Sequence, residues 1–83
     1  MDVQSLHPIR KIREDYQLSQ ADLAVILDVP ASFIGQIENG YSNVPERAIR
    51  ALCRHFKKDS ETIRKDLEEY REQYKQRVLA RLL

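Results

Sequence analysis

Residues 20–40, QADLAVILDVPASFIGQIENG, contain two short segments with helical periodicity and a tight break between them. Ser19 stands just before the first segment, where its hydroxyl can cap the first turn of a helix. The break falls before Pro30, which cannot extend one helix but can begin the next. Gly40 is typical of the residue that ends a helix. The stretch therefore predicts two helices joined by a short turn.

The small and apolar residues of this stretch recur at a characteristic spacing. The matching positions are residues 18–24, Leu27, Val29, Ile34 and residues 37–40. This pattern resembles the helix-turn-helix of the phage repressor/Cro family, the Xre type. The family needs a small residue where the two helices touch, and Ala24 fills that position. Asp28 stands where the turn usually holds glycine, and aspartate tolerates a left-handed backbone better than most residues do.

The resemblance covers residues 6–58 and implies a repressor-like DNA-binding domain. Because each apolar segment of the chain has a period near 3.6 and none alternates with a period of two, we expect an all-α fold of five helices, the last of them after residue 58. The resemblance also implies a sequence-specific DNA-binding transcriptional regulator, expected to be a repressor. Such a protein binds a two-fold operator as a homodimer, with its third helix in the major groove. A phage repressor, an antitoxin that represses its own operon and a controller of restriction-modification genes all fit this expectation. The competing interpretation is a helical hairpin with no role in DNA binding.

The composition is that of one small folded domain. The chain has 83 residues, of which 42% are apolar and 33% are charged. No apolar run approaches the roughly 18 residues of a membrane span. The first ten residues, MDVQSLHPIR, lack the apolar core of a signal peptide. We therefore expect a cytoplasmic protein that is associated with the nucleoid when it is bound to DNA.

Candidate metal-binding and catalytic residues are few and do not cluster along the chain. Cys53 is the single cysteine and lies on an apolar helical stripe, so we expect a buried, inert thiol. His7 and His55 have no neighbours at metal-ligand spacing. Because there is also no nucleophile-base pair and no phosphate-binding glycine loop, we expect no metal, no cofactor and no enzymatic activity.

The charge is nearly balanced, which is unusual for a DNA-binding protein. The net charge is +1; residues 1–58 hold eight basic and seven acidic side chains, and residues 59–83 hold six of each. Affinity for DNA must then come from geometry and from pairing two subunits. The low charge favours an alternative function. This is a protein-interaction module that keeps the fold and pairs through its C-terminal helix, for example an antitoxin-like partner.

An N-terminal helix is predicted before the helix pair. Ile9, Ile12 and Tyr16 recur at helical spacing and are expected to form its buried face. In the family that the chain resembles, an arginine at the position of Arg13 pairs with the glutamate that ends the recognition helix, here Glu38. The resemblance thus implies a partly buried ion pair between the first and third helices; a solvated Arg13 is the alternative.

The recognition helix matches the family at its base-facing positions. Gln36 can pair bidentately with adenine, and Ser32 can donate or accept a hydrogen bond. Phe33 either packs at the edge of the core, which we favour, or lies against a thymine methyl group. Gly35 either lets DNA approach closely or is simply tolerated on an exposed face. The residues implied to contact bases are Ala31, Ser32, Phe33, Gly35 and Gln36.

Phosphate contacts are implied for the start of the second helix and for the loop after the third. The residues concerned are Ser19, Gln20, Asn39, Tyr41, Ser42, Asn43 and Arg47. The helix dipole assists such contacts at a helix N-terminus, where Gln20 stands. The loop departs from the family because it has no lysine, and Glu46 occupies a position that is often basic. Arg47 is expected to compensate in part.

A fourth helix is predicted over residues 45–56, and a longer one over residues 60–82, which lack glycine and proline. We divide the chain into a helix-turn-helix domain, residues 1–58, and an amphipathic C-terminal helix, residues 59–83. Ile63 and Leu67 are expected to pack on the domain, whereas the rest of the stripe is left exposed. This remainder predicts dimerisation, although a different protein partner or a frayed tail is also possible. The dimerisation residues are Tyr70, Tyr74, Val78, Leu79 and Leu82.

Overall fold

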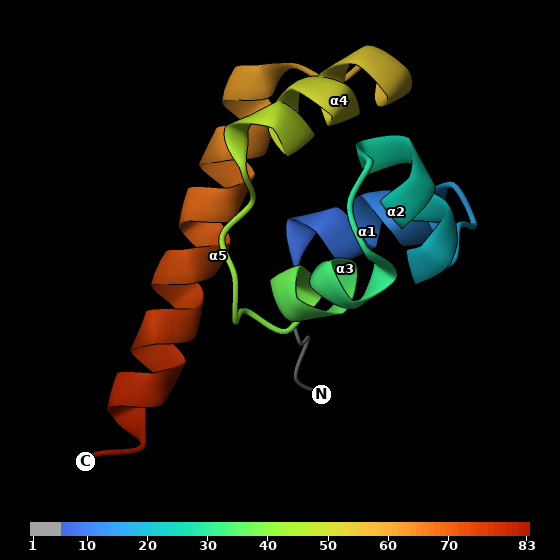
Figure 1. The fold of residues 1–83 in the computed structure, drawn as a ribbon. Coiled ribbons are helices and arrows are strands. Elements are labelled where there is room, and N and C mark those ends of the chain that lie inside the picture. Colours follow the sequence, from blue (N-terminus) through green and yellow to red (C-terminus); the bar gives the residue numbers. More distant parts are fainter. Residues whose placement is uncertain (1–5) are drawn as a thin grey trace.

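The computed structural model of the chain describes residues 6–83, which form five α-helices (Figure 1). The helices are α1 (Pro8–Asp15), α2 (Gln20–Leu27), α3 (Ala31–Glu38), α4 (Glu46–Phe56) and α5 (Ser60–Ala80). No strand occurs between residues 6 and 83, and the predicted all-α fold is confirmed. Residues 1–5, half of the segment inspected for a signal peptide, lie outside the described part.

Local hydrogen bonds set the ends of the helix pair as the sequence predicts. The Ser19 hydroxyl accepts the N–H of Asp22 at 3.0 Å, while the Asp22 carboxylate accepts the N–H of Ser19 at 2.9 Å. Hydrogen bonding from Ser19, first from its backbone N–H and then from its side chain, lowers the pKa of the Asp22 carboxyl group. Asp28 ends α2 in the left-handed conformation, with φ 58°. After α3 the chain turns at Gly40, whose φ of 84° suits glycine.

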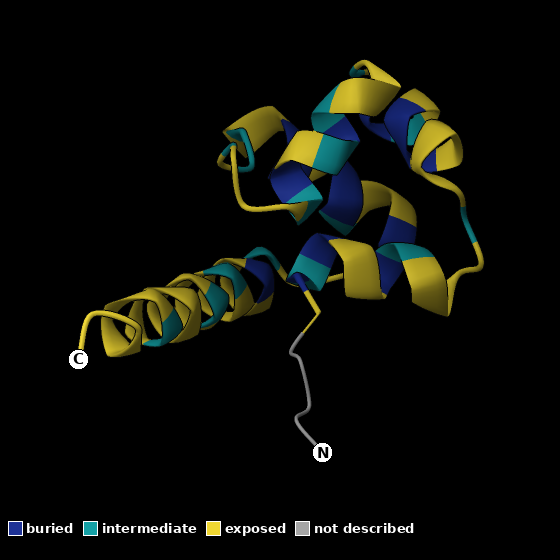
Figure 2. Cartoon of the chain, turned by 90° about the horizontal axis from the view of Figure 1, so that it is seen from below, coloured by how far each residue is buried: buried dark blue, intermediate teal, exposed yellow. Residues whose placement is uncertain are grey.

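All five helices contribute to one apolar core (Figure 2). α2 packs on α3 and α4, α1 contacts α3 and α5, and α4 contacts α5. Ala24 is buried on α2, the helix that packs most extensively on α3, as the family pattern requires of a small residue. The largest fully buried side chains are Ile9, Leu23, Ile34, Ile37 and Leu52. The apolar periodicity of the segments therefore identified most of the core.

Tyr16 is a correction to the predicted buried face of the first helix. Its side chain is 50% exposed, whereas Ile9 and Ile12 are buried. Helical spacing does not predict the direction of the Tyr16 side chain, because α1 ends at Asp15 and the chain then turns through Gln17, which has φ 56°. The Tyr16 ring instead lies 4.7 Å from the ring of Phe56, at the end of α4. It covers the edge of the core rather than entering it.

The first turns of α5 complete the core, and its later turns extend beyond it (Figures 1 and 2). Ile63 is buried and Leu67 is half-buried. Tyr70, predicted to be left exposed by the domain, is half-buried, with its ring 4.9 Å from the His7 ring. The division of the chain at residue 58 remains a prediction. Of the helices in residues 6–83, not one combines the length and apolar character that a membrane span requires.

His7 connects α1 to α5. It is only 7% exposed, and its Nδ1 accepts the N–H of Ile9 at 3.1 Å, which caps α1. Its ring meets Tyr70 edge-on. Burial lowers the pKa of His7 from its ordinary value of 6.5, and the nearby Glu38 carboxylate opposes this shift in part. Nothing in the local sequence indicated this role, since histidine is an uncommon helix cap.

We expect the free energy of unfolding to decrease as the pH falls from about 7.5 to 5.5. The unfolded chain takes up a proton on His7 near its ordinary pKa of 6.5, whereas the folded chain resists protonation until lower pH. His7→Asn retains a capping acceptor but does not titrate, so its stability should vary less over this range. Urea unfolding at several pH values measures this. His55→Asn, at an exposed position, is the control; a His7→Asn protein as pH-sensitive as that control would contradict the prediction.

Candidate nucleic-acid interface

One side of α3 is buried and the other is open to solvent. Ile34 and Ile37 lie in the core, whereas Ala31, Ser32 and Gln36 are exposed. Phe33 and Gly35 are half-buried, and the Phe33 ring packs against the core. The structure thus places Phe33 at the core edge, which was the favoured alternative. The exposed face of α3 is available to a groove of DNA, and its individual base contacts remain predictions.

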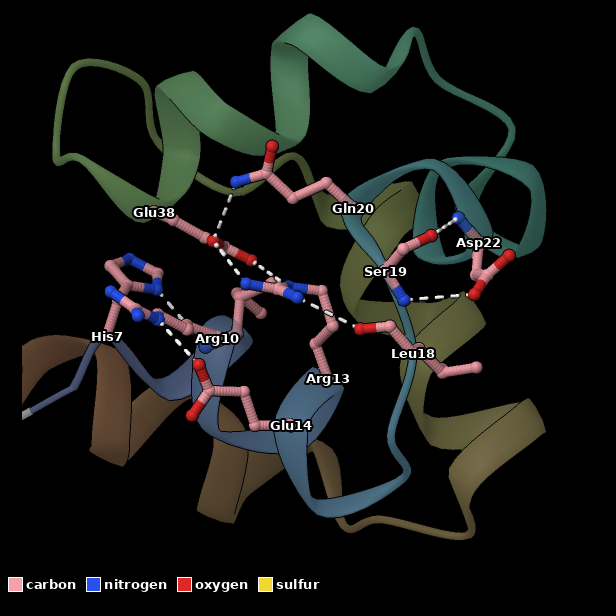
Figure 3. Close-up of polar contacts among 10 residues, drawn as sticks. His7, Arg10, Arg13, Glu14, Leu18, Ser19, Gln20, Asp22 and Glu38 are labelled. Carbon is pink, nitrogen blue, oxygen red and sulfur yellow. Dashed lines mark hydrogen bonds and ion pairs between the residues drawn. The ribbon is translucent and has the colours of Figure 1, made fainter.

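Arg13 and Glu38 form the ion pair that the family resemblance implied (Figure 3). Arg13 Nε lies 2.7 Å from Glu38 Oε2, and Arg13 Nη2 lies 3.1 Å from Oε1. A third guanidinium nitrogen donates to the carbonyl oxygen of Leu18 at 2.9 Å. The Arg13 and Glu38 side chains are only 14% and 5% exposed. The hydrogen bonds to Glu38 raise the pKa of Arg13, and the ion pair fixes α1 to the end of α3.

Gln20 joins this pair from the start of α2. Its Nε2 donates to Glu38 Oε1 at 3.0 Å, so one carboxylate receives bonds from both α1 and α2 (Figure 3). The same Gln20 amide would lie 3.8 Å from a β-carbon built at Gly35, which is ordinary van der Waals contact. Packing within the protein therefore does not require glycine at this position. From sequence, Gln20 was expected to contact only phosphate, and nothing indicated its bond to Glu38.

The remaining predicted phosphate-contacting residues do not all lie together. Ser42 donates to Gln36 Oε1 at 3.2 Å, which places the loop between α3 and α4 against the exposed side of α3. Asn39, Tyr41 and Asn43 are exposed in this loop. Ser19 uses its hydroxyl oxygen as the cap of α2.

Arg47 leaves this loop surface. Its Nη1 lies 3.4 Å from the carbonyl oxygen of Asp28, so the guanidinium reaches the turn between α2 and α3. That this side chain compensates for the missing lysine in the loop by binding phosphate stays a prediction. Phosphate contact by any of these residues stays a prediction.

α5 contributes two contacts to the loop side of the domain. Arg64 pairs with Glu46 at the start of α4, and Arg71 Nη2 donates to Asn43 Oδ1. Both pairs join residues far apart in the chain, so neither helical periodicity nor a local motif could indicate them. Neither pair was predicted from the sequence. Of the predicted dimerisation residues, Tyr74, Val78, Leu79 and Leu82 are exposed, and only Tyr70 is partly covered.

The single cysteine is less enclosed than predicted. Cys53 is half-buried beside the core rather than fully buried, and its thiol is free. Its place on α4 points the side chain to the core edge and not to the centre. Among residues 6–83, no three histidine, cysteine or carboxylate side chains come together in a way that could hold a metal ion.

Comparison with protein families agrees with this geometry. The helix-turn-helix family model matches residues 9–63, from α1 into the first turn of α5. The chain belongs to the Cro/C1-type helix-turn-helix family. It is therefore a DNA-binding helix-turn-helix regulator, and α3 is its recognition helix. Comparisons with curated proteins and with solved structures find no significant match.

We expect Glu38→Gln to lower the free energy of unfolding of this regulator by about 2–4 kcal/mol. The substitution leaves the Arg13 charge partly buried without its counter-ion, which is the costly way to break such a pair. Urea unfolding monitored by circular dichroism measures the change. Glu14→Gln is a matched control, because it breaks an exposed ion pair with Arg10 on α1 that should contribute less than about 0.5 kcal/mol. Equal losses in both variants would contradict the role of Glu38.

Proposed function

We propose that this regulator is a transcriptional repressor that binds a two-fold operator as a homodimer. The observation that carries the proposal is the exposed face of α3, held to α1 and α2 through the Glu38 carboxylate. A recognition helix fixed at its end presents its side chains to base edges in one orientation, which sequence-specific binding requires. A dimer bound across a promoter would block transcription by occupying the site.

The exposed end of α5 supports the homodimer. Tyr74, Val78, Leu79 and Leu82 are solvent-exposed apolar residues on one helix. Burial of such side chains is worth roughly 1.5–3 kcal/mol each, so several together could hold two chains at modest concentration. A two-fold dimer would also present two recognition helices at half-sites about 34 Å apart, one turn of DNA.

A second candidate function rests on the same helix and on the low net charge. The protein would keep the fold but act as an interaction module, using the apolar end of α5 to bind a different protein, as an antitoxin-like subunit does. Selection of bound sequences from random duplex DNA separates the two functions. Enrichment of an inverted repeat supports the repressor, and recovery of no sequence above background supports the interaction module.

We expect the protein to act in the cytoplasm, on the nucleoid when it is bound to DNA. We assign it no catalytic activity and no cofactor, since its proposed work is carried by hydrogen bonds and packing alone.

We expect Gln36→Ala and Gln20→Ala to weaken DNA binding in different ways. Gln36 should contact a base, so its loss should relax the preference for the selected operator at one position by about 1–3 kcal/mol. Gln20 should contact a phosphate, so its loss should weaken binding to all sequences alike. Titrations against the operator and point variants of it measure both effects. Gln73→Ala on α5 is the control, and the same uniform weakening in both test variants would refute the assignment.

We expect the protein to sediment as a dimer, twice its chain mass of 9.8 kDa, at micromolar concentration. Val78→Ser with Leu82→Ser should shift it to the monomer, because both side chains belong to the exposed stripe. Gln73→Ser with Gln76→Ser is the matched control on the polar side of α5. These substitutions test the stripe alone, because they leave in place Leu67 and Tyr70, which pack against the domain. A wild-type monomer at high micromolar concentration would disprove the homodimer.

A further inference from the structure

The charges of residues 59–83, which comprise α5 and the residues that flank it, are divided between two halves. Residues 59–70 carry five acidic and two basic side chains, whereas residues 71–83 carry four basic and one acidic. The first half therefore has a net charge of −3 and the second half a net charge of +3. The low net charge of the whole chain conceals this basic end. Its four basic residues are Arg71, Lys75, Arg77 and Arg81.

The path of α5 brings the basic end to the loop that follows the recognition helix. Figure 1 shows α5 running from the end of α4 past this loop, with the C-terminus beyond the other helices. Near the start of this path Arg64 pairs with Glu46. Two turns later Arg71 Nη2 donates to Asn43 Oδ1 at 2.5 Å. Residues of the loop, α4 and α5, together with His7, line a groove of about 840 Å³.

Arg71 lies next to the surface that faces DNA. Ser42, the neighbour of Asn43, donates to the exposed Gln36 of the recognition helix at 3.2 Å. Only these two loop residues separate Gln36 from the Arg71 guanidinium. Residues 39–45 contain no lysine or arginine. A cation that bonds to this loop is therefore supplied by α5 and not by the loop itself.

We propose that the C-terminal half of α5 is a basic arm that binds the phosphate backbone of duplex DNA beside the major-groove contact of α3. In this arrangement the Arg71 guanidinium exchanges Asn43 for a phosphate, and Lys75 follows one turn later on the same side of the helix. Arg64 neutralises Glu46, the acidic residue at an often-basic position, and so reduces its repulsion of DNA. At 1.5 Å per residue, the arm extends about 15 Å beyond Arg71.

This inference rests on DNA binding by the same protein, and salt dependence tests it separately. The logarithm of the binding constant falls linearly with the logarithm of the salt concentration. The slope of this line is about −0.9 for each phosphate that the protein neutralises. We compare the wild-type chain with Arg71→Gln/Lys75→Gln on a 30-base-pair mixed-sequence duplex and on the selected operator. Fluorescence anisotropy from about 50 to 200 mM salt gives the slopes, with sedimentation confirming equal oligomeric state.

The expected result is a slope smaller by one to two per chain, with the same fold-loss of affinity on both duplexes. Arg54→Gln/Lys58→Gln removes the same charge at the end of α4 remote from the loop, and its slope should match that of the wild type. An unchanged slope in Arg71→Gln/Lys75→Gln overturns the basic arm while leaving DNA binding intact. A loss of DNA affinity that occurs only because the dimer dissociates also overturns the basic arm. Binding of Arg71 and Lys75 to an acidic protein partner instead of DNA overturns it as well. If the wild-type chain binds neither duplex, the proposed function fails as well.

Discussion

The geometry of the recognition helix depends on the Glu38 carboxylate. This group accepts two bonds from Arg13 on α1 and one from Gln20 on α2, while it is itself at the end of α3. Removal of both charges from water is unfavourable unless each finds its partners in good geometry. The three helices must therefore meet in one arrangement for the pair to be satisfied. The contacts of Glu38 at the C-terminal end of α3 therefore orient the exposed side of the helix.

The helix pair carries few residues, so its rigidity comes from its surroundings. α3 has no side-chain cap at its start, where Pro30 precedes it, and Gly35 lies within it. Both features would weaken an isolated helix of eight residues. Burial of Ile34 and Ile37 against α2 compensates for this weakness. A short recognition helix can thus be held in place by its neighbours and still leave a polar face free for DNA.

α5 has two parts with different surroundings. Its first turns complete the core through Ile63, and Tyr70 rests on the His7 ring that caps α1. Its later turns leave the domain and expose an apolar stripe and the basic residues Arg71, Lys75 and Arg81, while Arg77 is half-buried. As proposed, Val78 and Leu82 of the stripe pair two chains, and Arg71 and Lys75, on the same side of the helix but nearer the domain, reach DNA. A net charge of +1 is then compatible with DNA binding, because the position of the charges matters more than their sum.

The sequence by itself determined the five helices, the turn between α2 and α3 and nearly all of the core. These features depend on spacings of three or four residues and on local caps such as Ser19, which operate within one segment. The Arg13–Glu38 pair could be predicted only through the family resemblance. The tertiary structure alone decided that Tyr16 stays half-exposed, that His7 is buried under Tyr70 and that Arg71 meets Asn43. Each of these outcomes depends on the path of the chain between elements, since Arg71 and Asn43 are 28 residues apart and share no local pattern.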